Sequence, residues 1–598
     1  MARNTYKEDE VVLQVDKKLT IVRLLRYLLD YKKTILTVLA IMFGSITISV
    51  LNPLIIERAI DVEITNKDTK GLIYLIIFAV ALNIIYILFT RLRMILMATV
   101  SNKIVEQIRN SVYEKLQNQS FHFFDARPTG KILARIIGDV NSLKDVLTDC
   151  VTTFIPDLLT VLAVLLIMLL KNWQLAMAAI ITFPILVGGM AFTMSLGHKR
   201  WQLFRKKNSN LNAYVHENFS GIRVVKSFVS EKESQGDFQQ LLDENVSTWS
   251  KAIIIMDLFG AVIEVTWALG GFFLYFIGIY IMGLGAVSVG TFLAFTTYLS
   301  MFWQPIRNLA SFYNKMVTNL SAAERVFELM DTEADIFDCE NALELQTLQG
   351  DIAFEHVSFA YPDEPETTVL DDVSFEVKSG ETIALVGPTG AGKTTIVHLL
   401  SRFYEATSGK VWMDSCNINE ISLRSLRKQM GVMTQENFMF SSSVRDNIKY
   451  GNLDATDEEV MDAAKAVCAH DFIMHLPKGY DTILEDKGSN LSSGQKQLIA
   501  FARTMVSKPS ILILDEATSS IDTHTELLVQ KGIAALLKNR TSFIIAHRLS
   551  TIKNADRIFV VIDGKIKEIG NHESLLEKKG TYYELYESQF KKVRNNFT

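Results

Sequence analysis

The sequence has few cysteines and no strong excess of charge of either sign. Its four cysteines, Cys150, Cys339, Cys416 and Cys468, are far apart in a chain of 598 residues and match no metal-binding or redox spacing. Lysine and arginine number 61 against 66 aspartates and glutamates, and the net charge of −5 gives no indication of a nucleic-acid partner. Internal repeats and low-complexity tracts are also absent from the sequence.

We expect no secretory signal, because the first eighteen residues are charged and have no apolar core. Residues 19–32 read Leu-Thr-Ile-Val-Arg-Leu-Leu-Arg-Tyr-Leu-Leu-Asp-Tyr-Lys, with apolar residues at helical spacing and basic residues between them. This pattern is typical of a helix that lies in a membrane interface.

Long apolar runs, by contrast, dominate the first half of the chain. Hydrophobic residues make up 49% of the sequence and mean hydropathy is +0.19, which is too apolar for two soluble domains and too charged for a chain embedded entirely in a membrane. Six stretches have about the 20 residues that are needed to cross a bilayer. They are 35–57, 72–96, 147–170, 175–196, 258–284 and 291–310, and we expect each to form a transmembrane helix.

Charged residues interrupt some of these runs. Arg91, Asp157 and Glu264 are costly to place in lipid, so we expect them to face the interior of the helix bundle or a water-filled cavity. For Arg91 and its neighbour Arg93, an equally good interpretation is a position near a helix end, from which the side chain reaches the interface.

The distribution of basic residues predicts how the helix bundle is oriented in the membrane. The long connections 99–146 and 197–251 are rich in lysine and arginine, whereas the short connections 65–70, 171–173 and 283–288 carry three lysines between them. By the positive-inside rule, the long connections, both termini and the second half of the chain are expected on the cytoplasmic side.

Residues 387–394 read Gly-Pro-Thr-Gly-Ala-Gly-Lys-Thr, the pattern of a phosphate-binding loop. The apolar run before the loop predicts a buried strand, and the run after it predicts a helix whose N-terminus adds partial positive charge. Three glycines allow backbone N–H groups to turn toward phosphate oxygens. We expect Lys393 to bridge the β- and γ-phosphates and Thr394 to hold Mg²⁺, so the motif predicts binding and hydrolysis of ATP.

A second apolar strand, 511–514, is followed by Asp515 and Glu516. Parallel strands that are covered on both faces present such residues at their carboxyl ends, beside the phosphates. Asp515 suits a direct or water-mediated contact with Mg²⁺, which takes few protein carboxylates. Glu516 is then available to orient or deprotonate the attacking water. The alternative is an acidic turn that caps the next helix.

Together with Leu-Ser-Ser-Gly-Gln at 491–495, these motifs resemble those of an ABC transporter, and they cover the whole second half of the chain. The resemblance implies that Tyr361 stacks on adenine, that Gln435 senses Mg²⁺ and the γ-phosphate, and that His547 is a switch histidine. Residues 519–522, ending in Asp522, resemble the loop that carries signals between the two nucleotide sites. Tyr361 also fits a core or edge position, and His547 also fits a structural role after its strand.

The residues implied by the motifs and the resemblance form three groups. The catalytic group is Glu516, His547 and Gln435, and the metal group is Thr394, Gln435 and Asp515. The nucleotide-binding group is Tyr361, Gly387, Pro388, Thr389, Gly390, Ala391, Gly392, Lys393, Thr394, Thr395, Ser492, Ser493, Gly494, Gln495 and Asp522.

The two long connections read as helical extensions with turn signals such as Ala-Arg-Pro-Thr-Gly at 126–130. They resemble the intracellular loops of exporter-fold ABC proteins, whose tips dock onto the ATPase domains. We expect the tips near 125–132 and 212–219, with Tyr214, His216 and Glu217 as candidate contacts; solvated charged hairpins are the alternative.

ABC ATPase sites form between two ATPase domains, so the resemblance implies a partner. The family signature reads Leu-Ser-Gly-Gly-Gln followed by Arg-Gln-Arg or Lys-Gln-Arg, whereas this chain has Ser493 for the first glycine and Leu498 for the last arginine. A complete catalytic face with an altered signature resembles the catalytically competent subunit of bacterial heterodimeric multidrug exporters. A homodimer that tolerates Ser493 is the alternative assembly.

The expected fold class is a membrane all-α domain of six helices with long cytoplasmic extensions, followed by an α/β P-loop ATPase domain. The expected domains are a tail with an interfacial helix at 1–33, a transmembrane domain at 34–330, a linker at 331–350 and an ATPase domain at 351–598.

The resemblance implies ATP-driven export of drugs, lipids or peptides across the bacterial cytoplasmic membrane, with ATP and Mg²⁺ as cofactors and membrane lipid and a second half-transporter as partners. Alternatives are an exporter-fold importer of metal chelates and an ATP-gated channel or sensor. An aromatic group near the last span is expected to line a substrate cavity or to serve in helix packing: Phe292, Phe295, Tyr298, Phe302 and Trp303.

Overall fold

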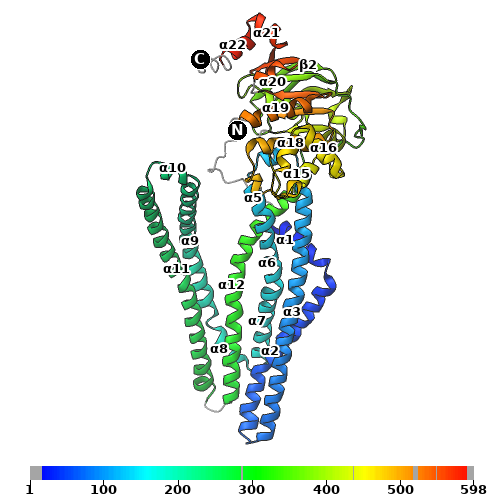
Figure 1. Ribbon diagram of the computed structural model, residues 1–598. Helices are drawn as coiled ribbons and strands as arrows, with labels where there is room; N and C mark the ends of the chain where they lie inside the picture. The colour runs from blue at the N-terminus through cyan, green and yellow to red at the C-terminus, as the bar shows by residue number, and fades with distance from the viewer. Residues whose placement is uncertain (1–16, 284–286, 435–436, 516–522, 547–548, 589–598) are drawn as a thin grey trace. The chain divides into compact units, whose positions relative to one another are not determined.

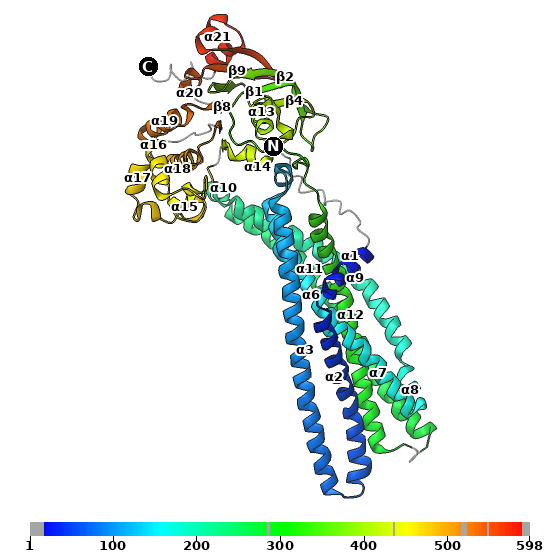
Figure 2. The same ribbon diagram turned by 90° about the vertical axis from the view of Figure 1, so that its right-hand side faces the viewer.

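The computed structural model describes residues 17–283, 287–434, 437–515, 523–546 and 549–588. The chain divides into two compact units. A helical unit comprises Thr5–Leu116 and Gly130–Thr332, and an α/β unit comprises Gln117–Thr129 and Glu333–Thr598. The α/β unit therefore includes a short internal piece of the long first connection. Figure 1 and Figure 2 show the elements of each unit from two sides.

The helical unit consists of long helices with short connections. Single π-helical turns follow α2 at Ala59–Ile64 and α11 at Ile277–Ile281, and others lie at Arg135–Asp139 and Cys150–Phe154. The α-helices are α1 Lys17–Leu29, α2 Lys32–Arg58, α3 Thr69–Gln117, α5 Thr129–Ala134, α6 Val140–Asp149, α7 Ile155–Lys171, α8 Trp173–Ile180, α9 Phe183–Ser220, α10 Ile222–Ser227, α11 Glu231–Phe276 and α12 Val289–Asp331.

Five helical segments are long and apolar enough to cross a membrane by length and composition, within the described part of the chain. They are 32–64, 69–117, 129–171, 173–220 and 231–281. The sixth expected span, 291–310, forms the first half of α12 but is not among the five. Its inward face packs in the core of the helical unit, where Ala294, Phe295 and Leu299 are buried.

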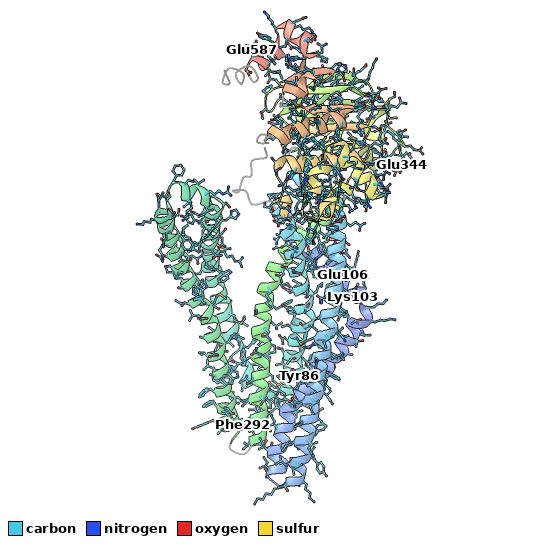
Figure 3. All side chains as sticks on the ribbon, in the orientation of Figure 1. Tyr86, Lys103, Glu106, Phe292, Glu344 and Glu587 are labelled. Carbon is cyan, nitrogen blue, oxygen red and sulfur yellow. The ribbon has the colours of Figure 1, made fainter. Side chains whose placement is uncertain are left out.

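Several helices continue beyond their apolar stretches. In α3, Tyr86 belongs to the apolar part, and the charged residues Lys103 and Glu106 lie farther along the same helix (Figure 3). The helices α9 and α11 pack along each other and are joined by α10 (Figure 1). The predicted helical extensions of both long connections are thus present.

The position predicted for the tip of the second connection is wrong by several residues. Helix α9 runs without a break to Ser220, so 212–219 is helical and the turn lies at α10 and the residues that flank it. In the first connection, the predicted segment 125–132 begins at the last residue of α4, Phe121–Asp125, and reaches into α5. Helical periodicity indicates where a helix lies but marks its end poorly.

The three charged residues of the apolar runs differ in burial. Asp157 is half-buried in the helical unit, whereas Arg91 and Glu264 are exposed in this chain, so they are not in the packed interior of the bundle. Helix α1 has an exposed apolar stripe of Leu19, Val22, Leu25 and Leu29, as an interfacial helix requires.

The α/β unit contains two sheets. One is antiparallel with the order β2-β1-β4-β5, and the other has six strands in the order β10-β9-β3-β8-β7-β6. The strands are β1 Ile352–Ala360, β2 Thr368–Val377, β3 Thr382–Val386, β4 Ser408–Met413, β5 Cys416–Asn417, β6 Met430–Met433, β7 Ile511–Asp515, β8 Thr541–Ile545, β9 Arg557–Ile562 and β10 Lys565–Gly570.

The helices of this unit complete its layers. They are α4, α13 Lys393–Leu400, α14 Leu423–Lys428, α15 Val444–Lys449, α16 Asp457–Ala466, α17 His470–Met474, α18 Ser493–Val506, α19 Thr523–Leu537, α20 Leu549–Lys553, α21 His572–Lys578 and α22 Thr581–Tyr586. Single 3₁₀ turns occur at Ile418–Glu420, Gly479–Asp481 and Asp486–Gly488.

The six-stranded sheet is buried on both faces. Alternate residues of β7 serve two different cores: Leu512 and Leu514 pack with the helices α15 to α19, and Ile511 and Ile513 pack with the antiparallel sheet and α13. Such two-sided burial explains why these strands have apolar residues at successive positions, at 383–386 in β3, 511–514 in β7 and 543–545 in β8.

Candidate functional site

The carboxyl ends of four parallel strands meet at one edge of the six-stranded sheet. Strand β8 lies between β3 and β7, with Leu385 and Asp515 both in register with Ile545, and β6 pairs with β7 through Met433 and Leu514. In the sequence, the phosphate loop follows β3, Asp515 ends β7, and the predicted residues Gln435 and His547 come after β6 and β8. Ligands of open parallel sheets bind at this edge, so the topology brings the separate motifs to one place.

The phosphate loop follows β3 directly and ends at the first turn of α13. Gly390 and Gly392 have φ values of +85° and +100°, in the left-handed region that L side chains rarely adopt. A Cβ atom at Gly392 would also lie 2.7 Å from Leu370 Cδ2. The loop conformation therefore depends on glycine at these positions, and it leads the backbone into the N-terminus of α13, a favourable place for an anion.

Lys393 lies inside the loop and is almost entirely buried. Its ammonium group donates to the carbonyl oxygens of Gly387 and Pro388, at 2.8 Å each. Burial lowers the pKa of Lys393 below its ordinary value, and the carboxylate of Asp515 partly opposes this shift. Asp515 at the end of β7 is therefore close enough to the phosphate loop to act electrostatically on Lys393.

The side chains expected to hold Mg²⁺ present oxygen atoms at this edge. Thr394 is exposed in the first turn of α13, and Asp515 ends β7. A hydroxyl and a single carboxylate suit Mg²⁺, which prefers oxygen ligands and keeps several waters and phosphate oxygens in its shell. No cluster of three or more His, Cys, Asp or Glu side chains that could hold a metal occurs in the described residues.

Tyr361 stands at the end of β1, close to α13. Its hydroxyl lies 3.1 Å from Oγ1 of Thr395, and its ring makes an edge contact with Tyr404 at a centroid distance of 5.1 Å. Burial raises the pKa of Tyr361, so the phenol is neutral at physiological pH. The structure brings Tyr361 to the phosphate-loop helix, where an adenine stacking on its ring would leave the phosphates within reach of the loop.

Four of the predicted site residues fall outside the described residues: Gln435, Glu516, Asp522 and His547. In the sequence, Glu516 follows Asp515 at the end of β7, and His547 follows Ala546 after β8. Their roles stay predictions.

The signature residues begin helix α18. Ser492 is the N-cap, and its hydroxyl accepts from the backbone N–H of Gln495 at 3.2 Å while Gln495 Oε1 accepts from the N–H of Ser492 at 3.0 Å. Ser492 and Ser493 are exposed, whereas Gly494 is buried. Leu498, which stands where the family signature has its last arginine, is buried in the hydrophobic core that the six-stranded sheet forms with α15 to α19.

The signature and the phosphate loop lie in different parts of the α/β unit. Helix α18 packs against α15, α16 and α19, whereas α13 packs against β2 and β8 (Figure 2). The exposed N-terminus of α18 is therefore available to another molecule and does not complete the phosphate loop of its own chain.

Comparisons with known proteins agree with this geometry. Residues 34–306 match the family model of the ABC transporter transmembrane region, and residues 370–519 match a second family model, described as ABC transporter. An uncharacterized ABC transporter ATP-binding protein of Bacillus subtilis, YknV, is 38% identical over 592 residues, which cover 99% of this chain and 98% of that protein. The chain belongs to the ABC transporter family.

Other relatives place this ABC transporter among the exporters. An ATP-dependent lipid A-core flippase of Syntrophus aciditrophicus is 39% identical over 83% of this chain and 82% of that protein. A putative multidrug export ATP-binding/permease protein of Staphylococcus aureus is 36% identical over 95% of this chain and 99% of that protein. The structure of a bacterial Atm1-family ABC exporter with ATP bound matches with a TM-score of 0.78 at 27% identity, over 94% of this chain and 98% of that one.

These findings confirm the predicted family and the predicted fold class, a helical exporter-type membrane region followed by an α/β ATPase domain. They also confirm that the ABC transporter carries an ATP-binding, ATP-hydrolysing domain. The α/β unit is therefore called the ATPase unit below.

The aromatic residues of α12 do not line an open cavity in this chain. Phe295, Tyr298, Phe302 and Trp303 are buried in the core of the helical unit, and the Tyr298 hydroxyl donates to the carbonyl oxygen of Val50 at 2.9 Å. Helix packing, the alternative stated for these residues, accounts for them, because each lies on the face of α12 that contacts other helices.

Sequence patterns did not indicate how α4 is held by the ATPase unit. Phe121 stacks on Phe403 at a centroid distance of 4.7 Å, and Tyr404 donates a hydrogen bond to Asp125 at 2.8 Å. The run Phe-His-Phe-Phe-Asp at 121–125 is the available signal, since three aromatic residues are unusual in a solvated turn.

Proposed function

We propose that this chain is the catalytically competent half of a heterodimeric ABC exporter, which uses ATP and Mg²⁺ to move amphipathic drugs, lipids or peptides out across the bacterial cytoplasmic membrane. The observation that supports the proposal is the arrangement of Lys393, Thr394 and Asp515 at one sheet edge combined with Ser493 in an exposed signature. The multidrug and lipid names of the relatives support the substrate class.

The roles that we propose for individual residues follow from their positions around the carboxyl-terminal edge of the six-stranded sheet. Lys393 binds the β- and γ-phosphates, Thr394 and Asp515 hold Mg²⁺ with Gln435, and Tyr361 stacks on adenine. Bound Mg²⁺ neutralises charge on the transferring phosphate. Glu516 takes the proton of the attacking water, His547 and Gln435 support the γ-phosphate, and Asp522 belongs to the loop that communicates with the second site.

A second half-transporter supplies the signature that faces the phosphate loop of this chain. The exposed helix N-terminus at Ser492 and Ser493 would contact the partner's nucleotide, and the partner's signature would contact the nucleotide on Lys393. The tip around α10 supports the same assembly, because it presents apolar side chains that a solvated hairpin would avoid. These are Phe219, Val224, Phe228 and Val229, which are 72%, 61%, 78% and 80% exposed.

Purification of the chain with and without its partner tests the assembly. The chain alone should show little ATPase activity, and the mixed complex should hydrolyse ATP and be stimulated by amphipathic substrates. Strong, substrate-stimulated ATPase from a dimer of this chain alone would contradict the heterodimer and establish the homodimer.

A further inference from the structure

Histidine 122, on α4, lies between two carboxylates of the ATPase unit. Its Nδ1 is 2.8 Å from Oδ2 of Asp335, and its Nε2 is 3.1 Å from Oδ1 of Asp363. A neutral imidazole has one N–H and can donate to one of these carboxylates, whereas the imidazolium donates to both. The geometry thus favours the charged form.

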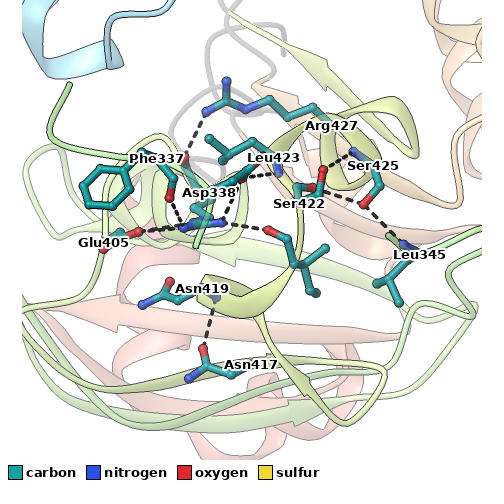
Figure 4. Close-up of polar contacts among 12 residues, drawn as sticks. Phe337, Asp338, Leu345, Glu405, Asn417, Asn419, Ser422, Leu423, Ser425 and Arg427 are labelled. Atoms are coloured by element: carbon teal, nitrogen blue, oxygen red, sulfur yellow. Dashed lines mark hydrogen bonds and ion pairs between the residues drawn. The ribbon is translucent and has the colours of Figure 1, made fainter. Parts of the chain in front are cut away.

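Both carboxylates are held in place by the ATPase unit. Asp363 belongs to a tight turn in which the N–H of Glu364 donates to the carbonyl oxygen of Tyr361 at 3.0 Å. Asp335 precedes a segment fastened to the unit at Phe337 and Asp338: the Phe337 carbonyl accepts from the guanidinium of Arg402 at 3.1 Å, and Asp338 accepts from the N–H of Leu423 at 2.8 Å (Figure 4).

A second contact joins α4 to the residues around Tyr361. Asp125, one turn after His122, accepts the hydrogen bond of Tyr404, whose ring lies against the ring of Tyr361. Helix α4 therefore touches the surroundings of Tyr361 twice, through His122 to the turn at Asp363 and through Asp125 to Tyr404. The chain joins α4 to α3 on one side and to α5 on the other.

We infer that protonated His122 is a positioning residue that clamps α4 to Asp335 and Asp363, fixes the turn carrying Tyr361, and makes nucleotide affinity and α4 docking depend on pH. This inference rests on the proposed role of Tyr361 in adenine binding. The clamp acts through Asp363 and Tyr361, since His122 itself has no expected contact with nucleotide.

The groups around His122 support a pKa above the ordinary value of histidine. Burial opposes the charge of His122, but the hydrogen bonds to Asp335 and Asp363 outweigh burial and raise its pKa above the ordinary value of 6.5. The other groups that surround it are Asp125 on its own helix and Tyr404, Tyr361 and His398 on the ATPase unit. Burial raises the pKa of both tyrosines and lowers the pKa of His398, so these three stay neutral at pH 7 to 8.

The direction of the pH effect follows from this shift. The raised pKa means that the clamp is complete below pH 6.5 and is lost as the pH rises through the raised pKa of His122. Above that pH the imidazole is neutral and can donate to only one of the two carboxylates, so the two-sided clamp is lost. Asp335 still accepts a hydrogen bond from the Ser120 hydroxyl at 3.1 Å, whereas His122 is the contact of α4 with Asp363.

The test uses the full-length transporter with its partner in nanodiscs, between pH 6 and 8.5. His122→Gln should raise the KM for ATP about fivefold at pH 6.5, with a smaller effect on kcat, and should flatten the pH dependence of KM. His122→Arg should keep the low KM at every pH, because its charge does not titrate in this range. His475→Gln is the matched control, since His475 is exposed and its Nδ1 lies 2.6 Å from the carbonyl oxygen of Asp471, far from α4 in the sequence.

Hydrogen exchange of residues 120–126 provides a readout without turnover. In the wild type, exchange should speed up as the pH rises, after correction for the intrinsic pH dependence, and His122→Arg should abolish this change. Asp363→Asn should mimic His122→Gln while leaving the Asp335 contact in place. Absence of ATPase in every preparation would contradict the proposed function alone. A His122→Gln variant with wild-type KM, pH profile and exchange would overturn the clamp.

Discussion

The ammonium group of Lys393 lies 2.8 Å from the carbonyl oxygen of Gly387, six residues earlier in the chain. The phosphate loop thus closes on its own lysine, and a bound phosphate must compete with two carbonyl oxygens for this cation. Exchange of these neutral acceptors for charged phosphate oxygens favours the nucleotide, since hydrogen bonds between charged partners are the stronger ones.

Lys393→Ala should weaken ATP binding and hydrolysis together, because it removes positive charge from both ground and transition states. We expect kcat/KM to fall by about 10²-fold or more. Lys393→Arg is the matched control for charge: it should recover binding in part but little turnover, since a guanidinium cannot fill the same buried space. Fluorescent-nucleotide titration and steady-state ATPase measure the two effects. Wild-type ATP affinity in Lys393→Ala would exclude this residue as the phosphate ligand.

Glu516→Gln should abolish turnover while ATP binding is retained, because the amide keeps the shape of the side chain but cannot accept the proton of water. Loss of one general base costs on the order of 10²- to 10⁴-fold in rate. The measurement is steady-state ATPase of the reconstituted complex, with nucleotide binding as the control for folding. More than half of the wild-type activity in the variant would rule out Glu516 as the catalytic base.

Tyr361→Ala should mainly raise the KM for ATP, by about tenfold, since stacking is equally strong in the ground and transition states. Tyr361→Phe is the matched control, because it keeps the ring and loses only the hydroxyl that contacts Thr395. The phenylalanine variant should therefore retain a KM near that of the wild type. A normal KM with depressed kcat in Tyr361→Ala would contradict the stacking role.

Ser492→Ala should destabilise α18 by about 1 kcal/mol, because it removes the N-cap that accepts from the Gln495 N–H. Ser492→Asp should restore the cap and the thermal stability, yet it should suppress ATPase of the complex by placing a carboxylate where the partner's phosphates bind. Thermal unfolding and ATPase rates, measured on the same samples, separate the two effects. Equal activity of the aspartate variant and the wild type would argue against an intermolecular signature site.

Ser493→Gly distinguishes the two assemblies. In a homodimer, both sites use the altered signature, so restoring glycine should preserve or raise the activity of the chain purified alone. In the heterodimer, Ser493 faces the partner's slow site, and the substitution should change the activity of the complex much less than Glu516→Gln does. A large gain of ATPase in the isolated chain would support the homodimer.

The sequence by itself determined the family, the membrane half and the phosphate loop. Apolar runs of bilayer length depend only on composition, and the loop at 387–394 needs glycine and lysine at fixed local positions. The capping box at Ser492 and Gln495 is equally local, since its hydrogen bonds join residues three apart. Interactions of this kind are encoded within one stretch of chain and can be read from it.

Tertiary structure alone decided which distant residues meet. The tip of the second long connection lies at α10 and not at 212–219, because helical periodicity does not mark the residue at which a helix ends. The aromatic residues of α12 became core residues because other helices cover them. The contact of His122 with Asp335 and Asp363 spans 213 and 241 residues of sequence, and only the folding of the chain brings these charges within hydrogen-bonding distance.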